Sequence, residues 1–416
     1  MSRPNSCQHA VAGKSVAASG SVYFVVASVT PNGGRVFDPD QLPELKRLVW
    51  EATQGDSGLL DEVLRDAALL RPVTTIQPRN INSISLVASD GGNNRLDFNP
   101  FSLQVVRVVD TFGDELFLDV ISPSTDTIAL GQRHLDEQTP LGRLMRDLGA
   151  STLGELSPMI PAKPTFRGWP LVYRDLCEWA VLYDLICYER WGSDTLILRD
   201  GLLRSKIFAS KIFAGKAESL FIKLYGLIKE AIERNRRERR RDIFLAGIAK
   251  HSRVIERYRL AIAIEEVFRA GQPCYVPVPP EIQIKVYDWA EYVQSPEDAE
   301  TDKEKPKFNM GAMYLVRFGK QSADPIWTVD LLQFQATKAQ QIFGSLLADA
   351  EQGFPVPCYP HCLQEADRHA RVADQDLAIL QHATEDAVRD QIREDRRPVF
   401  DAQLLLPADP AAGRYQ

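Results

Sequence analysis

The sequence has few cysteines, no long apolar run and no excess of positive charge. Six cysteines among 416 residues show no regular spacing, and a chain of this length does not need disulfides to stay folded. The longest early apolar run, residues 22–27, is too short to cross a bilayer, and no charged segment leads into an apolar one as in a secretory signal. We therefore expect a cytoplasmic protein that does not enter a membrane.

The formal net charge of −7 gives no overall basic field that would attract nucleic acid, although a local basic groove can lie on an acidic protein. Residues 12–15, Ala-Gly-Lys-Ser, have the end of a Walker motif without its first glycine, so any ATP hydrolysis must come from a partner. The cysteines and histidine of residues 358–362, CYPHC, have no second pair to complete a structural zinc site. Neither Ser89 nor Ser205 lies in the pattern of a hydrolase nucleophile.

Apolar periodicity predicts an α/β protein. Helical spacing is found at residues 43–53, 58–70, 170–190, 219–237, 254–270, 335–352 and 363–380. Short runs rich in β-branched and aromatic residues predict strands at 21–29, 81–88, 103–109, 115–120, 195–199, 242–248, 272–279, 313–318 and 327–331. The three consecutive strands from residue 81 to residue 120 indicate an antiparallel meander.

Composition suggests how the chain is divided. We expect a flexible N-terminus at 1–20, an α/β arm at 21–75, a main domain at 76–385 with a mobile charged insertion at 295–308, and a polar tail at 386–416.

Two predicted strands end in an aspartate followed by glycine, Asp90-Gly91 and Asp200-Gly201. Each strand would deliver a carboxylate to the edge of the sheet, where glycine allows a sharp turn. Carboxylates that converge there repel one another unless a cation lies between them, and oxygen ligands suit magnesium or manganese. A single Asp-Gly pair is more often a structural turn than part of a metal site. The second pair makes a metal site more plausible but does not decide between the two interpretations.

Further charged candidates lie on the helix at 170–190 and after the strand at 242–248. Asp175 and Glu178 share one face of that helix, with Glu189 further along; they could bind a metal or form ordinary ion pairs. Lys250 could contact a phosphate or orient water, or it could be an exposed lysine.

In order and spacing, five segments together resemble the NurA nuclease family over about residues 80–380: SDGGNN, LILRDGLL, LAGIAKHSR, MYLVRF and CYPHCLQEADRHARV. The resemblance implies an RNase H-like mixed β-sheet core flanked by helices, with the N-terminal α/β arm and C-terminal helices attached to it. It also implies a homodimer that cuts DNA with Mn²⁺ or Mg²⁺ and works with HerA, a hexameric ATPase that translocates DNA.

Matched by position, Asp90 and Asp200 are the metal-binding carboxylates of the two strands, and Glu178 is the glutamate of the helix, with Glu189 as the alternative. Lys250 matches the lysine of the family's Gly-x-x-Lys motif, which lies at a strand end. Where many relatives have a histidine, this chain has Asp367, which is either a further metal ligand or a change in rate or metal preference. The resemblance implies that two metal ions flank the scissile phosphate.

Basic residues near these motifs are candidates for DNA contacts. Lys206 and Lys211 follow Asp200 closely, and Arg237 and Arg240 belong to the basic run 234–241, which could instead be a solvated helix end. Such backbone contacts predict cutting without sequence preference. The resemblance implies a role in DNA end processing or in defence against phage. The alternatives are a catalytically weak scaffold that binds the ATPase ring and DNA, and a relative that cuts RNA.

Overall fold

The computed structural model describes residues 41–79, 85–98, 101–160, 162, 168–213, 216–269, 271–287, 309–371 and 374–404. The chain divides into two units, residues 1–59 and residues 60–416. Helix α1 (Leu42–Gln54) has no buried residue, and α2 (Ser57–Ala67) follows it. The strand predicted at 21–29 and the insertion predicted at 295–308 lie outside the described residues, and the predicted domain boundaries stay predictions.

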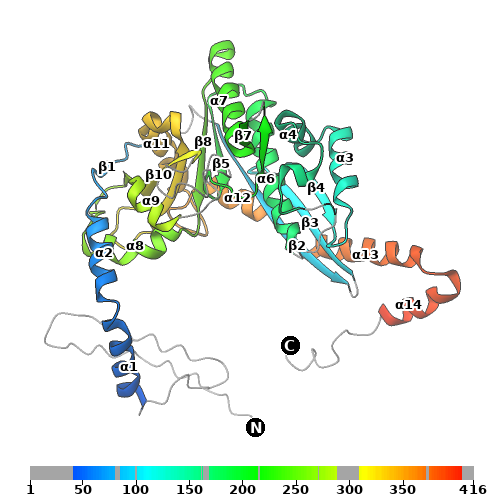
Figure 1. The fold of residues 1–416 in the computed structure, drawn as a ribbon, viewed down its shortest axis with the longest axis horizontal. Coiled ribbons are helices and arrows are strands. Elements are labelled where there is room, and N and C mark those ends of the chain that lie inside the picture. The colour runs from blue at the N-terminus through cyan, green and yellow to red at the C-terminus, as the bar shows by residue number, and fades with distance from the viewer. Residues whose placement is uncertain are drawn as a thin grey trace, which may run out of the picture. The chain divides into compact units, whose positions relative to one another are not determined.

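A mixed sheet of nine strands forms the centre of the second unit, in the order β1-β9-β10-β11-β8-β5-β2-β3-β4 (Figure 1). Its strands are β1 (Thr74–Thr75), β2 (Ser85–Phe98), β3 (Phe101–Asp110), β4 (Glu115–Ile121), β5 (Thr195–Asp200), β8 (Ile243–Ala249), β9 (Cys274–Pro277), β10 (Gly311–Arg317) and β11 (Trp327–Leu332). Strands β2, β5 and β8 are parallel, and the other pairs are antiparallel. The almost wholly buried β5 and β8 are typical of parallel strands covered on both faces.

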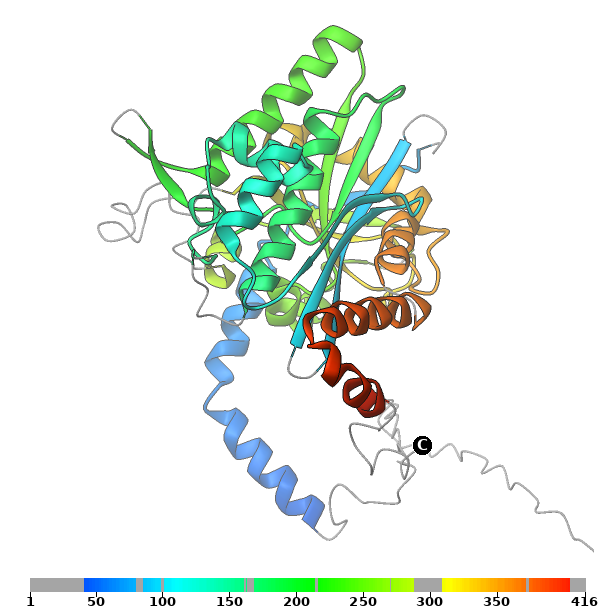
Figure 2. The ribbon, with the colours of Figure 1, turned by 90° about the vertical axis from the view of Figure 1, so that its right-hand side faces the viewer.

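The two faces of the sheet bury different helices, and Figure 2 shows the sheet between them. Because side chains alternate along a strand, Val87, Ile197 and Leu245 point to one face, where α6 (Trp169–Cys187) and α7 (Leu220–Arg239) pack. Their neighbours Ala88, Leu198 and Ile248 point to the other face, toward α11 (Ala339–Ala350) and α12 (His361–Ala370). We call these the α6 face and the α12 face.

The remaining elements are helices and one hairpin outside the central sheet. They are α3 (Thr127–Glu137), α4 (Pro140–Leu148), α5 (Leu153–Leu156), the hairpin β6 (Ser210–Phe213) and β7 (Lys216–Ser219), α8 (Arg253–Ile264), α9 (Pro280–Val286), η4 (Gln333–Lys338), α13 (Asp374–Gln391), η5 (Glu394–Arg396) and α14 (Arg397–Leu404). A third apolar cluster joins α2 to α8 and α9. None of the helices in the described ranges is long and apolar enough to span a membrane.

The prediction of an α/β chain with a mixed sheet flanked by helices is confirmed, including the meander β2-β3-β4 and the hairpin β10-β11. Three details were wrong. Strand β2 does not end at Asp90, because β3 pairs with it for eight further residues, to Phe98. The last predicted helix is two helices, α12 and α13. Helix α8 ends at Ile264, earlier than predicted.

Candidate metal centre

Asp90, Asp200 and Lys250 meet where the pairing of the three parallel strands stops. Asp200 and Lys250 lie at the ends of β5 and β8, and Asp90 lies on β2 directly after its last pair with β5. Ser89 pairs with Arg199 across β2 and β5, and Asp200 pairs with Ile248 across β5 and β8. By the alternation of side chains, Asp90, Asp200 and Lys250 all lie on the α12 face. The predicted convergence of the two Asp-Gly motifs is therefore present.

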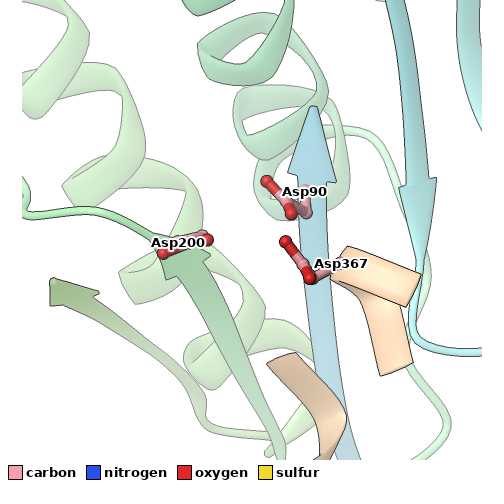
Figure 3. A group of neighbouring side chains, drawn as sticks. All are labelled: Asp90, Asp200 and Asp367. Atoms are coloured by element: carbon pink, nitrogen blue, oxygen red, sulfur yellow. The ribbon is translucent and has the colours of Figure 1, made fainter. Parts of the chain in front are cut away.

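Helix α12 supplies the third carboxylate, Asp367. The helix is held in place at both ends: the Cys362 N–H donates to Asp349 Oδ2 (3.1 Å), and Arg107 Nη1 donates to the carbonyl of His369 (3.0 Å). One carboxylate oxygen each from Asp90, Asp200 and Asp367 lies within 4.8 Å of the other two (Figure 3). His369, two residues on from Asp367, is not part of this group.

Two cationic side chains contact this cluster. Arg371 Nη2 lies 2.7 Å from Asp367 Oδ2, and the side chain of Arg371 is mostly exposed. The other cation is Lys250, whose Nζ lies 2.7 Å from Asp200 Oδ2 and 3.0 Å from Asp367 Oδ1. Burial by itself lowers the pKa of Lys250, but the hydrogen bonds and charges of Asp200 and Asp367 raise it above its usual value. Three carboxyl groups therefore face one ammonium and one exposed guanidinium.

Asp90 carries the unbalanced charge of the cluster. Burial raises its pKa to about 6, and the negative charge of Asp200 adds to the shift while Lys250 opposes it. Asp367 behaves differently: burial favours its neutral form, but the hydrogen bond and charge of Lys250 lower its pKa. The lysine thus neutralises one side of the cluster and leaves Asp90 to repel its neighbours.

This donor set fits a hard divalent cation. Magnesium and manganese prefer carboxylate oxygens and keep several waters, so a few carboxylates at a half-exposed edge suffice. The side chains of Asp200 and Asp367 are 20% and 27% exposed, which leaves room for such waters. A bound cation would relieve the repulsion that raises the pKa of Asp90.

The turn after Asp200 is built for this position. Gly201 has φ of +113°, a conformation that residues with a side chain rarely adopt, so the Asp-Gly pair lets the chain leave the strand sharply. The loop that follows is anchored by fully buried Asp330, which accepts from the Leu203 N–H (3.1 Å) and from Arg204 Nε (3.0 Å). The anchored loop fixes the carboxylate at the end of β5.

Glu178, the predicted helix carboxylate, lies on the α6 face rather than in the cluster of three. Its oxygens are 3.2 Å from Arg174 Nε and 3.5 Å from Arg199 Nη2, whereas Asp175 holds Arg199 more closely, at 2.6 Å. Burial raises the pKa of Glu178 to about 8, and the two guanidinium groups only partly offset the effect. Near neutral pH, Glu178 is therefore mostly protonated.

The carboxyl group of Glu178 nevertheless lies close to the cluster. It rests on Gly91, the neighbour of Asp90, where any side chain would overlap it. Pairing of β2 with β5 stops at Ser89, so the two strands are no longer bonded beside Asp90. The negative charge of Asp90 contributes to the raised pKa of Glu178. The alternative residue, Glu189, is exposed beyond the other end of α6 and leads to the start of β5, away from the cluster.

The structure separates the four basic residues predicted to contact DNA. Lys206 is exposed in the loop after Asp200, on the side of the metal centre. Lys211 is in β6, and its side chain is outside the described part of the chain. Arg237 and Arg240 lie at the end of α7 that leads into the start of β8, so they are at the opposite edge of the sheet from the carboxylates (Figure 1).

Sequence reasoning missed Tyr359, which lies beside the metal centre. Burial raises the pKa of its phenol strongly, and the negative charges of Asp200 and Asp90 add to the effect. Its ring packs on Trp327 at 4.6 Å between centroids, and its hydroxyl has no hydrogen-bond partner among the described residues. The motif CYPHC contains this tyrosine, but the sequence has no signal that distinguishes it from the other eleven.

Comparison with known proteins gives structural similarity alone, since no family model and no curated protein matches this chain. The NurA nuclease from Sulfolobus solfataricus is similar with 14% identity and a TM-score of 0.40, over 85% of this chain and 98% of that one. A NurA bound to dAMP and manganese has 10% identity and a TM-score of 0.39, over 88% and 100% of the two chains. A NurA with manganese has 9% identity and a TM-score of 0.36, over 87% of this chain and 100% of that one.

These structures come from the family whose motifs the sequence resembles.

Proposed function

We propose that this protein is a metal-dependent nuclease that hydrolyses phosphodiester bonds in DNA without sequence preference. The observation that supports the proposal is the group of three carboxylates, Asp90, Asp200 and Asp367, from two parallel strand ends and a helix. Such a group, short of positive charge at a half-exposed edge, is a site for a divalent cation. When bound there, Mn²⁺ or Mg²⁺ would supply charge stabilisation to the phosphate and lower the pKa of an attacking water.

The residues around the cation would position the substrate. Asp90, Asp200 and Asp367 would hold the first cation. Lys250, whose ammonium group already lies at this edge, would neutralise negative charge that develops on the phosphate. Tyr359 would donate its free hydroxyl to an oxygen in the site.

A second cation would need Glu178. Its carboxyl group reaches the cluster over Gly91, at the place where β2 and β5 are no longer paired. To bind a cation, Glu178 would have to lose its proton and loosen its contacts with Arg199 and Arg174. We therefore propose that a second position fills after the first and at higher pH.

The wider biological role follows from the family resemblance. We propose an RNase H-like core, a homodimer, and a HerA-like hexameric translocase as partner, in DNA end processing or defence against phage. The acidic balance of the chain supports a need for the partner, because a protein with net charge −7 attracts DNA weakly by itself.

The direct test is cleavage of labelled single- and double-stranded DNA with Mn²⁺, Mg²⁺ or a chelator. We expect cleavage that depends on the metal and is lost in Asp200→Asn. Metal binding without cleavage would favour the alternative, a scaffold that binds the ring and DNA; the contacts of Lys250 with two of the three carboxylates support that alternative. Cleavage of an RNA strand in preference to DNA would show that the substrate is RNA rather than DNA.

A further inference from the structure

A groove runs from the metal centre along α8. It consists of two neighbouring cavities of about 630 Å³ and 400 Å³, both lined by Lys250, Ile255, Arg259 and Ile326. The larger cavity continues to Phe268, Arg269 and Arg317, between the end of α8 and the turn that joins β10 to β11. Both volumes are in the range of ligand sites, roughly 300–1,000 Å³, and are too small for a duplex.

Lys250 joins this groove to the metal centre. Its ammonium group contacts Asp200 and Asp367, and the same side chain forms part of the wall of both cavities. A chain molecule that lies in the groove would therefore pass directly beside the carboxylates. Lys250 is therefore the residue that the groove and the metal centre share.

The groove presents two arginines that have no ion-pair partner among the described residues. Arg259 and Arg269 are exposed, and within the described residues neither guanidinium group has a hydrogen-bond or ion-pair partner. Such groups at a concave surface are available to bind phosphate.

A third cation lies in the wall. Arg317 is only 1% exposed, and its two Nη atoms donate to the carbonyls of Phe268 (3.2 Å from Nη1) and Arg269. Its Nε has no partner, and in the described part of the chain no carboxylate is within ion-pair distance of the guanidinium. The two carbonyls accept hydrogen bonds from the guanidinium but do not neutralise its charge. Burial of a cation without a counter-charge costs free energy of folding. An anion in the groove would supply that counter-charge.

Acidic side chains also line the groove. Glu266 and Asp324 line the larger cavity, and Glu256 lines the smaller one. Asp324 is engaged by the backbone of its own turn, where it accepts from the Gln321 N–H (2.6 Å). Lys250 is already paired with Asp200 and Asp367, so the cations of the groove that can bind a phosphate are the arginines. Apolar wall residues such as Ile255 and Ile326 provide surface for sugars and bases.

We propose that this groove binds the sugar–phosphate backbone of the single strand that flanks the scissile phosphate, with Arg259 and Arg269 on successive phosphates and Arg317 as the buried counter-charge. The inference rests on the proposed function, because it assigns the substrate strand of that same centre. It also predicts that a duplex must be opened before its strand can occupy the groove.

The test separates the groove from the metal centre. The double variant Arg259→Glu/Arg269→Glu is compared with wild type and with Arg190→Glu, an exposed residue beyond the end of α6 at the opposite edge of the sheet. Binding of a fluorescent single-stranded oligonucleotide is measured by anisotropy with Ca²⁺ at several salt concentrations, and a blunt duplex of the same sequence is measured in parallel. Hydrolysis of bis(p-nitrophenyl) phosphate with Mn²⁺ reports on the centre alone.

We expect the double variant to bind the single strand roughly tenfold more weakly. The slope of its logarithmic affinity against logarithmic salt concentration should be shallower by about 0.7 for each phosphate that the variant no longer binds. Arg190→Glu should bind as wild type does, the duplex should show no difference among the three proteins, and hydrolysis of the small diester should stay within about twofold.

Equal single-strand binding by the double variant and Arg190→Glu would overturn the proposal. If wild type does not hydrolyse the small diester, the proposed function is contradicted. The binding measurement then still shows whether the groove binds a single strand. If the double variant melts early, Arg259→Gln/Arg269→Gln replaces it.

Discussion

The two faces of the sheet carry acidic groups at the same edge, but they balance them differently. On the α12 face, three aspartates meet one lysine and the exposed Arg371, and the aspartates are partly exposed. On the α6 face, Asp175 and Glu178 share two arginines, Arg174 and Arg199, and the side chains of Glu178 and Arg199 are the more buried ones.

The difference shows that surplus charge and access to water, rather than the number of carboxylates, indicate where a cation binds first. On the α6 face, arginine and a retained proton remove the negative charge without a metal. On the α12 face, neither cationic side chains nor a bound proton removes all of the negative charge. Asp90 therefore still repels the neighbouring carboxylates. The comparison predicts that loss of a buried arginine on the α6 face lowers mainly stability, whereas loss of a carboxylate at the metal centre lowers mainly activity.

The largest effect on stability is expected from Arg199→Met. This change leaves Asp175 without its partner at 2.6 Å and removes the guanidinium that lies 4.6 Å from the ring of Trp179. Breaking a buried pair costs about 3–5 kcal/mol, and the partial exposure of Asp175 puts the loss near the lower end, about 3 kcal/mol. Urea unfolding measures it. Arg174→Met is the control, with an expected loss below about 1 kcal/mol; equal losses in both would contradict the assigned pairing.

Asp200→Asn should remove activity and leave the fold intact. Even partners that only orient a metal ligand cost about 10–100-fold when changed, so loss of a ligand should lower DNA cleavage by more than about 100-fold. Thermal melting should show a protein no less stable than wild type, because a negative charge in a crowded cluster is removed. Retained cleavage would take Asp200 out of the mechanism.

Asp90→Asn should stabilise the metal-free protein. The pKa of Asp90 is raised to about 6 in the folded state from 3.8, so its contribution to stability is complete below about pH 4 and is lost as the pH rises through 6. The neutral asparagine avoids this loss, which is on the order of 3 kcal/mol at pH 8. Urea unfolding with chelator at pH 4 and pH 8 measures the difference. A variant that is less stable than wild type at pH 8 would contradict the predicted repulsion.

Glu178→Gln should have the smallest effect on stability. With a pKa of about 8, Glu178 is mostly neutral at pH 7, and glutamine resembles the protonated acid, so the expected change in stability is below about 1 kcal/mol. If Glu178 holds the second cation, DNA cleavage falls about tenfold (about 1.4 kcal/mol). Cleavage by wild type should also rise as the pH passes through 8, and the variant should lack that rise. Identical pH profiles would remove Glu178 from the centre.

The sequence was sufficient to predict the order of strands and helices and the meeting of Asp90, Asp200 and Lys250, because parallel strands that alternate with helices end at one edge. It was not sufficient to assign Glu178 to a face. That depends on the residues it meets in space, Arg199 and Gly91, and helical periodicity says nothing about them. The course of β2 past Asp90 was also hidden, since two glycines and two asparagines read as a turn until β3 pairs with them.

The groove along α8 could not be predicted either. Arg259 and Arg317 are 58 positions apart, and only the packing of α8 beside β10 and β11 brings them to one cavity. By contrast, the clustered arginines of residues 234–241 were candidates for DNA contacts in the sequence. They lie at the edge of the sheet opposite the carboxylates.

The most direct test of the central claim is calorimetric titration of Mn²⁺ into the wild-type protein, Asp200→Asn, Asp367→Asn and, as the matched control from the other face, Asp175→Asn. The account predicts a tight site in wild type and in Asp175→Asn that is lost in both of the other variants. Equal Mn²⁺ affinity in all four proteins would show that the three carboxylates do not form a metal centre.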